Sequence, residues 1–367
     1  MDILTQIENY SHGGYDWKSA LQSTEQDAEY HGEGNVWLHT MLVVESLLND
    51  TGYKALAPDR QKLLLLAAIL HDIAKPFCTR TEDGKIISPN HAVKGETTAR
   101  KLLYKYGFMK ELFGELNFTE REQVCAMVRY HGLPLLFWDK GEKAVFRASL
   151  EIAPEYLYIL AKADINGRYS ASNAGNLENI ELFRDYCIEN GCFENAKAFP
   201  SESGRFAYFS GDSADCNYAP YEKDKFLVYM MSGIPASGKD TYISSHLRGL
   251  PVISLDGIRA EMGVDPSKNQ GIVVQEAKLR AKKLLAKKEP FVWNSTNTTK
   301  KIRTPLVDMF AGYGAKVEIV YVEAPVSELF KRNARRAKPV PENVIHKLID
   351  NLEVPKIWES HALSYAE

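Results

Sequence analysis

Hydrophobic and polar residues alternate in two different ways along this chain. Over residues 1–200, apolar positions recur at the three- and four-residue spacing of amphipathic helices, and few segments alternate as strands do. The clearest helical stretches are Trp37–Val44, Gln61–Leu70, Glu122–Tyr130, Leu157–Ala163 and Ile180–Ile188. This pattern predicts an all-α domain, with one weak hairpin at Thr79–Ile87, where Asp83-Gly84 is a favourable turn pair.

The pattern changes after a stretch at residues 201–224, which is rich in Ser, Gly, Pro, Asp and Tyr and predicts an irregular linker packed through its aromatic residues. Short β-rich runs then alternate with helical stretches over residues 225–367. The expected strands are Phe226–Met231, Val252–Leu255, Phe291–Trp293 and Val317–Val322, and the expected helices are Gln270–Lys288, Lys300–Ala311 and Val326–Arg336. Such alternation predicts a parallel sheet covered on both faces, and therefore an α/β domain after the linker.

Charge separates the same two parts. The net charge of −3 is a sum of −10 over residues 1–224 and +7 over residues 225–367. A sign change on this scale suggests two modules with different partners. The length of 367 residues is also in keeping with two or three domains.

Membrane and disulfide-scaffold classes are not expected. The longest purely apolar run, Leu63–Leu70, is far shorter than a membrane span, and Met1–Tyr10 does not resemble a secretory signal. The five cysteines form no C-x-x-C pair. We therefore expect reduced thiols and a cytoplasmic protein without a membrane partner.

A glycine-rich motif begins the second domain. Gly233-Ile-Pro-Ala-Ser237-Gly238-Lys239 follows a predicted strand and precedes a predicted helix, which is the setting of a phosphate-binding loop. Its backbone N–H groups would surround the phosphates of a nucleoside triphosphate, and Lys239 would reach the β- and γ-phosphates. Asp240 stands where a magnesium-binding Ser or Thr is usual, so either Asp240 or Thr241 would serve the Mg²⁺ or Mn²⁺ ion.

Two further motifs suit phosphoryl transfer. Asp256 follows the second strand and could accept a proton from an attacking hydroxyl, while Arg259, one helical turn later, could hold an acceptor phosphate. Arg332 and Arg336 are four residues apart and would share one face of a helical lid that delivers cations to the transferring group. Taken singly, these residues also suit a helix cap and a solvated basic helix.

Together, G-x-P-x-S-G-K, D-x-x-R and R-N-x-x-R resemble the motifs of the phage-type 5′-OH polynucleotide kinases over roughly residues 225–360. The resemblance implies that Lys239 binds the donor phosphates and Asp256 is the general base. It further implies that Arg259 contacts the acceptor phosphate and that Arg332 and Arg336 contact the donor. The polar end of the third strand, which includes Thr296 and Asn297, resembles a substrate-binding segment of that family.

The first domain carries the doublet His71-Asp72 at the end of its most apolar helix. The other candidate metal ligands are His39, His91, His131 and Asp164. Histidine and carboxylate together suit divalent transition metals, and a bridging Asp would allow two ions, as used in phosphoester displacement. Lys75 and Arg168 each follow a candidate ligand by about one helical turn, and both could neutralise a docked phosphate.

The segments L-H-D-I-A-K-P at residues 70–76 and N-H-A-V-K-G at residues 90–95 resemble signatures of the HD phosphohydrolase superfamily. That resemblance implies a helical fold and metal-dependent phosphoester hydrolysis. One metal would be ringed by His39, His71, Asp72 and Asp164, and a second by Asp72, His91 and His131. His31 is an additional candidate, which either protonates a leaving group or has no catalytic role.

An HD domain followed by such a kinase resembles the bacterial HD-Pnk family of end-healing enzymes. The resemblance implies removal of a 2′,3′-cyclic phosphate, or of a 2′- or 3′-phosphate, from one RNA or DNA end. It also implies transfer of an NTP phosphate to a 5′-OH end, which leaves ends for a separate ligase. One alternative is an HD nucleotidase fused to a nucleoside or small-metabolite kinase. A second is a nucleotide-gated regulatory protein whose P-loop only switches conformation, against which Asp256 and the full set of HD ligands argue.

Overall fold

The computed structural model describes residues 2–11, 16–221, 226–265 and 270–366. The chain divides into two compact units, Met1–Ala198 and Phe199–Glu367. None of the described helices is both long and apolar enough to cross a membrane. Residues 222–225, where the linker was expected to end, lie outside the described residues.

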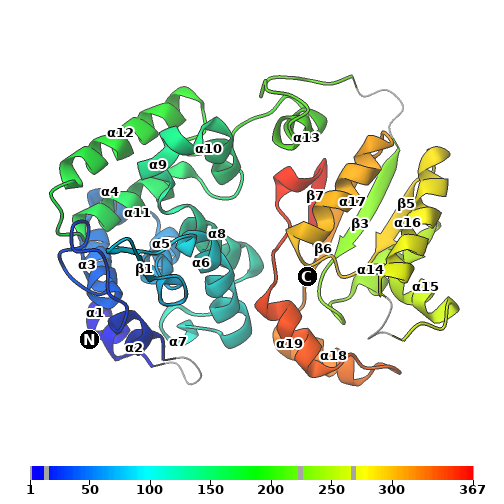
Figure 1. The fold of residues 1–367 in the computed structure, drawn as a ribbon, viewed down its shortest axis with the longest axis horizontal. Helices are drawn as coiled ribbons and strands as arrows, with labels where there is room; N and C mark the ends of the chain where they lie inside the picture. Colours follow the sequence, from blue (N-terminus) through cyan, green and yellow to red (C-terminus); the bar gives the residue numbers. More distant parts are fainter. Residues whose placement is uncertain (1, 12–15, 222–225, 266–269, 367) are drawn as a thin grey trace. The chain divides into compact units, whose positions relative to one another are not determined.

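In its described residues the first unit is helical, as predicted, apart from one hairpin and an isolated bridge between Glu25 and Asn35 (Figure 1). Its elements up to the hairpin are α1 (Ile3–Asn9), α2 (Trp17–Gln22), α3 (Val36–Asn49), α4 (Thr51–Ala55), α5 (Pro58–Leu70), the 3-10 turn η1 (Lys75–Phe77), β1 (Arg80–Glu82) and β2 (Lys85–Ile87). The later ones are α6 (His91–Arg100), the π-helical turn η2 (Lys101–Lys105), α7 (Lys110–Phe113), α8 (Phe118–Tyr130), α9 (Leu133–Lys140), α10 (Glu142–Ser149), α11 (Pro154–Asn166) and α12 (Asn173–Glu189).

The core of this unit forms around α5. Its residues Leu63–Leu70 are all buried, so the longest apolar run of the sequence is a central helix packed on several sides. Helix α6 packs closely on α8 at Gly95, which has no side chain to obstruct the contact. A Cβ at this position would lie only 2.9 Å from Val128. The hairpin predicted at Thr79–Ile87 is confirmed, and its two turn residues adopt positive φ, 50° for Asp83 and 77° for Gly84.

The second unit contains a five-stranded parallel sheet in the order β4-β5-β3-β6-β7 (Figure 1). Its elements up to β5 are α13 (Glu202–Ser210), β3 (Leu227–Ser232), α14 (Lys239–His246), β4 (Val252–Ser254), α15 (Leu255–Glu261), α16 (Gln270–Ala286) and β5 (Phe291–Asn294). The later ones are α17 (Lys300–Gly312), β6 (Lys316–Val322), α18 (Val326–Ala334), α19 (Glu342–Asp350), the 3-10 turn η3 (Ile357–Glu359) and β7 (Ala362–Ala366).

Both faces of the sheet are covered, as the sequence pattern predicts. Helices α15, α16 and α17 share one apolar core with it, and α14 packs in a separate core with Met231, Val292 and Val320. The strand order reverses at β3, which lies between β5 and β6. In sheets of this kind the crevice beyond the carboxyl end of such a strand is where ligands bind.

Part of the expected irregular linker is instead a helix. Ser201 caps α13 by accepting a hydrogen bond from the Gly204 N–H, and Phe206 is buried in the core beneath the sheet. The guanidinium of Arg205 donates to the backbone oxygen of His361 at 2.5 Å. The small and polar residues of this stretch gave no clear helical pattern. Helix α13 nevertheless forms, because its aromatic face is buried against the second unit.

Candidate functional site

Six side chains from five helices or helix ends meet inside the first unit. His39 lies within α3, Asp164 within α11, and the His71-Asp72 doublet directly follows α5. His91 is the first residue of α6, and His131 directly follows α8. The structure therefore brings together all six of the metal ligands that the sequence suggested, with one histidine pair on each side of Asp72.

Each histidine pair has two ring nitrogens facing each other. Nε2 of His39 lies 3.3 Å from Nε2 of His71, and Nε2 of His91 lies 3.3 Å from Nε2 of His131. The Nδ1 atoms of His71, His91 and His131 each lie within 2.8 Å of a backbone carbonyl, so Nδ1 carries the proton and Nε2 a lone pair. In the His91–His131 pair two lone pairs therefore face each other, and they repel unless a cation lies between them, so this arrangement fits a divalent metal ion. The His39–His71 pair has the same spacing of its Nε2 atoms.

Asp72 lies between the two pairs. Its Oδ2 is 3.3 Å from Nε2 of His71, and its Oδ1 is 3.5 Å from Nε2 of His91. Oδ1 is buried and accepts no hydrogen bond from the described residues. A buried carboxylate oxygen without a donor is costly unless a cation binds it, so Asp72 also fits a ligand shared by two ions.

The two predicted cations are held by site carboxylates. Lys75 Nζ lies 2.7 Å from Oδ2 of Asp72, and Arg168 donates to both oxygens of Asp164, at 3.0 and 2.5 Å. Burial raises the pKa of Asp72, but the Lys75 ammonium and His71 outweigh it and hold the pKa well below the usual range. Burial and the neighbouring histidines lower the pKa of His131 to about 3, whereas at His71 burial is outweighed by Asp72 and Asp164, which raise its pKa. Ionised carboxylates and neutral imidazoles are the forms that bind metal.

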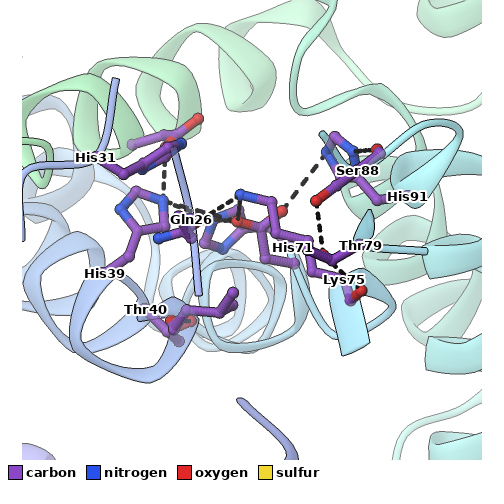
Figure 2. A network of polar contacts seen from close by, with 12 residues as sticks. Gln26, His31, His39, Thr40, His71, Lys75, Thr79, Ser88 and His91 are labelled. Carbon is purple, nitrogen blue, oxygen red and sulfur yellow. Dashed lines mark hydrogen bonds and ion pairs between the residues drawn. The ribbon is translucent and has the colours of Figure 1, made fainter. Parts of the chain in front are cut away.

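Sequence reasoning missed two residues of this site. The side-chain oxygen of Gln26 accepts a hydrogen bond from Lys75 Nζ at 2.5 Å, and Glu33 Oε1 lies 2.8 Å from Nδ1 of His31. Both belong, with His31, to the irregular segment before α3. Figure 2 shows this network, with His31 and His39 at one end and His91 at the other. Glu33 could have been suspected because it lies between His31 and His39 in the sequence, whereas Gln26 carried no such signal.

In the second unit, the glycine-rich motif joins β3 to α14 as predicted. Gly233 has a φ of 147°, and a Cβ there would lie 2.3 Å from the Val322 oxygen. Ser237 Oγ is buried without a hydrogen-bond partner among the described residues. Lys239 Nζ donates to the oxygens of Gly233 and Ile234 at 2.8 and 2.9 Å, and burial lowers its pKa to about 8. The loop therefore has unsatisfied donor capacity suited to phosphate oxygens.

A cavity of about 1320 Å³ opens above this loop. Among its lining residues are the predicted Ser237, Gly238, Lys239, Asp240, Thr241, Asp256, Arg259, Thr296, Arg332 and Arg336. Asp256 is 80% exposed and accepts a hydrogen bond from Arg259. Asp240 accepts one from Asn294 at 2.7 Å, which ties the helix start to the end of β5.

Two details differ from the expectations. Arg332 lies in the last turn of α18 and donates to the Ser237 oxygen at 3.2 Å, but α18 ends at Ala334. Arg336 therefore lies in the connector to α19 rather than on the same helix face, although both arginines line the cavity. The structure does not bring Asn297 to the cavity: it is buried, and its amide donates to the Met231 oxygen at 2.7 Å, which supports β3.

The fold and these two sites define a helical phosphohydrolase-type domain followed by a P-loop domain. Residues 37–164 match the HD domain family, and residues 228–355 match an AAA domain family. The chain is similar to L-seryl-tRNA(Sec) kinase of Methanococcus maripaludis, at 21% identity over 136 residues, which is 35% of this chain. The chain spans about half the length of that relative, 53%. The chain thus joins an HD phosphohydrolase domain to a P-loop kinase-like domain.

Proposed function

We propose that this protein heals broken nucleic-acid ends with two separate active sites, as the HD-Pnk resemblance implies. The HD site would remove a 2′,3′-cyclic phosphate, or a 2′- or 3′-phosphate, from RNA or DNA. The kinase site would transfer the γ-phosphate of an NTP to a 5′-OH end. The products would be a 3′-OH and a 5′-phosphate, which are the ends that a separate polynucleotide ligase joins.

The observation that carries the HD half is the pair of facing Nε2 atoms on each side of Asp72, 3.3 Å apart in both pairs. His39, His71, Asp72 and Asp164 would hold one divalent ion, and Asp72, His91 and His131 a second. When bound, such ions supply Lewis-acid catalysis and an activated water for phosphoester hydrolysis. Lys75 and Arg168 would orient and neutralise the phosphate, so that the P–O bond to the leaving ribose oxygen breaks as the water oxygen bonds to phosphorus.

In the kinase half, Asp256 would take the proton of the 5′-OH while the new O–P bond forms and the β–γ bond of the donor breaks. Lys239, Arg332 and Arg336 would neutralise the donor phosphates. In the described structure Arg259 is bonded to Asp256, and Lys239 is bonded to two loop carbonyls. Phosphate binding would therefore replace these internal contacts, which frees Asp256 to act as the base.

Three observations favour a polynucleotide acceptor. The cavity of about 1320 Å³ exceeds the roughly 300–1,000 Å³ of most single-ligand pockets, so it has room for a donor and an acceptor end. Residues 225–367 carry a net charge of +7, which suits a polyanion. The kinase relative is named for a seryl-tRNA, a substrate carried on RNA.

Reciprocal substitutions test this proposal. Asp256→Ala is expected to abolish phosphorylation of a 5′-OH oligonucleotide and to leave removal of a 3′-phosphate unchanged, and Asp72→Ala is expected to do the reverse. Asp308→Ala and Asp139→Ala, which remove exposed carboxylates from α17 and α9, serve as matched controls. Loss of both activities in one folded variant would contradict the two-site proposal. A preference for free nucleosides over oligonucleotides would favour a nucleoside kinase instead.

A further inference from the structure

One buried carboxylate faces two histidines of the HD site. Glu33 Oε1 lies 2.8 Å from Nδ1 of His31 and 3.0 Å from Nδ1 of His39, and the Glu33 side chain is 1% exposed. Its other oxygen accepts the backbone N–H of Tyr169 at 2.9 Å. Neither the metal-ligand set nor the phosphate-binding cations explain why a carboxylate is buried here.

The remaining site histidines have a different partner at Nδ1. His71, His91 and His131 lie at helix boundaries, where each Nδ1 contacts the backbone oxygen three residues earlier. These contacts are His71 to Ala68 at 2.7 Å, His91 to Ser88 at 2.8 Å and His131 to Val128 at 2.8 Å. A backbone carbonyl can only accept, so it fixes the tautomer that leaves Nε2 free for a metal.

His39 lies inside α3, where such an arrangement is not open to it. The Asn35 oxygen accepts the backbone N–H of His39 itself, and the Val36 oxygen accepts the Thr40 hydroxyl. His39 is fully buried, and its Nδ1 makes no well-aligned hydrogen bond among the described residues, so the Glu33 carboxylate 3.0 Å away is the group placed to accept an Nδ1–H once the ring binds a metal. Glu33 lies on this side of the ring, while Nε2 on the other side faces Asp164 Oδ1 at 3.0 Å.

The position of Glu33 is itself fixed by the backbone. The Gly32 N–H donates to the Tyr169 oxygen at 3.0 Å, next to the bond from the Tyr169 N–H to Glu33. A Cβ on Gly32 would lie 2.8 Å from that Tyr169 oxygen, so this approach requires glycine. These two hydrogen bonds connect the loop that carries Glu33 to Tyr169, the residue directly after Arg168.

We propose that Glu33 is a positioning residue of the HD metal centre: it fixes His39 in the tautomer that presents Nε2 to the metal, and it orients His31 beside it. A carboxylate at Nδ1 also makes the imidazole a stronger ligand, and loss of such a partner typically lowers metal affinity about 10–100-fold. The inference rests on the assignment of His39 as a ligand under the proposed function, but not on the identity of the substrate.

Glu33, His31 and His39 lie close enough together to surround an ion themselves. Direct ligation is disfavoured by the orientation of the groups. Nε2 of His39 already faces the Asp164 and His71 side of the site, and Glu33 Oε2 is occupied by the Tyr169 N–H. A neutral imidazole can offer only one lone pair, so His39 cannot serve ions on both sides.

Titration of the metal-free full-length protein with Co²⁺, followed by its visible absorption, tests this role without any enzyme assay. Glu33→Gln is expected to weaken Co²⁺ binding about 10–100-fold at one site, to alter the absorption spectrum and to leave the number of bound ions unchanged. Glu45→Gln, which removes an exposed charge from α3, is the matched control and is expected to bind as the wild type does. Circular dichroism establishes that each variant is folded.

Wild-type Co²⁺ affinity and spectrum in Glu33→Gln would overturn the inference. Loss of one whole equivalent of Co²⁺ would overturn it too, because Glu33 would then be a ligand. If Glu33→Gln does not fold, Glu33→Asp decides in the same way, since it keeps the charge but withdraws the oxygens by one methylene. If the wild type binds no Co²⁺, or His39→Ala binds it normally, the metal site of the proposed function fails instead.

Discussion

Arg100 offers a quantitative test of how the HD site is held in place. Its side chain is 2% exposed and joins α6, which begins with His91, to α8, which ends just before His131. The guanidinium donates to both oxygens of Glu122, at 2.8 to 3.0 Å, and to Glu96 at 2.7 Å. Arg100→Met would keep the volume but leave two largely buried carboxylates without this partner.

Removing one member of a buried ion pair typically costs about 3–5 kcal/mol. Glu122 would retain the Nε–H of Arg121 at 2.9 Å, so we expect the lower value, about 3 kcal/mol. For a unit of this size that corresponds to a fall in melting temperature of about 6–12 °C. Differential scanning calorimetry of the full chain would measure it, and the double variant Arg100→Met, Glu122→Gln should recover part of the loss. A melting temperature within about 2 °C of the wild type would refute the reasoning.

Three further predictions concern the sites themselves. Gly233→Ala should abolish NTP binding, because its Cβ would lie 2.3 Å from the Val322 oxygen. The control Gly249→Ala, also at positive φ but in open space, should bind NTP normally, and calorimetric titration with an NTP measures both. Gln26→Leu removes the side-chain oxygen that accepts a hydrogen bond from Lys75. It should lower the catalytic efficiency of phosphate removal from a 3′ end roughly tenfold without changing 5′ phosphorylation. Steady-state kinetics of both reactions measure this, and equal loss of both would indicate misfolding instead. Because burial lowers the pKa of Lys239 to about 8, its ammonium is present below that pH and lost above it. NTP affinity should therefore be constant below about pH 8 and fall progressively above it, and a flat profile from pH 7 to about 9.5 would exclude this role of the charge.

The sequence predicted those parts of the molecule that rest on local chemistry. The run Leu63–Leu70 indicated a buried helix, and the Gly233–Lys239 motif indicated a strand–loop–helix unit, because in both the residues that define the element are contiguous. The His and Asp residues of the HD site were found from residue type and from their resemblance to a family pattern.

Features that depend on tertiary packing could not be read in the same way. Helix α13 lies in a Ser- and Gly-rich stretch, and only the burial of Phe206 beneath the sheet explains it. Asn297 is of a residue type that often binds substrates, but its side-chain amide donates a hydrogen bond to the Met231 oxygen next to the P-loop. The partner of a buried group, such as Gln26 for Lys75, depends on which loop folds over it.

The most direct test of two-ended healing is a single reaction on a nicked RNA that carries a 2′,3′-cyclic phosphate on one side and a 5′-OH on the other. The full-length protein would be supplied with Mg·ATP and a divalent transition metal, and the products analysed by mass spectrometry. The proposed function predicts a 3′-OH and a 5′-phosphate on the two ends, with one ATP consumed per 5′ end. An unchanged end on either side, with metal and ATP bound to the protein, would contradict it.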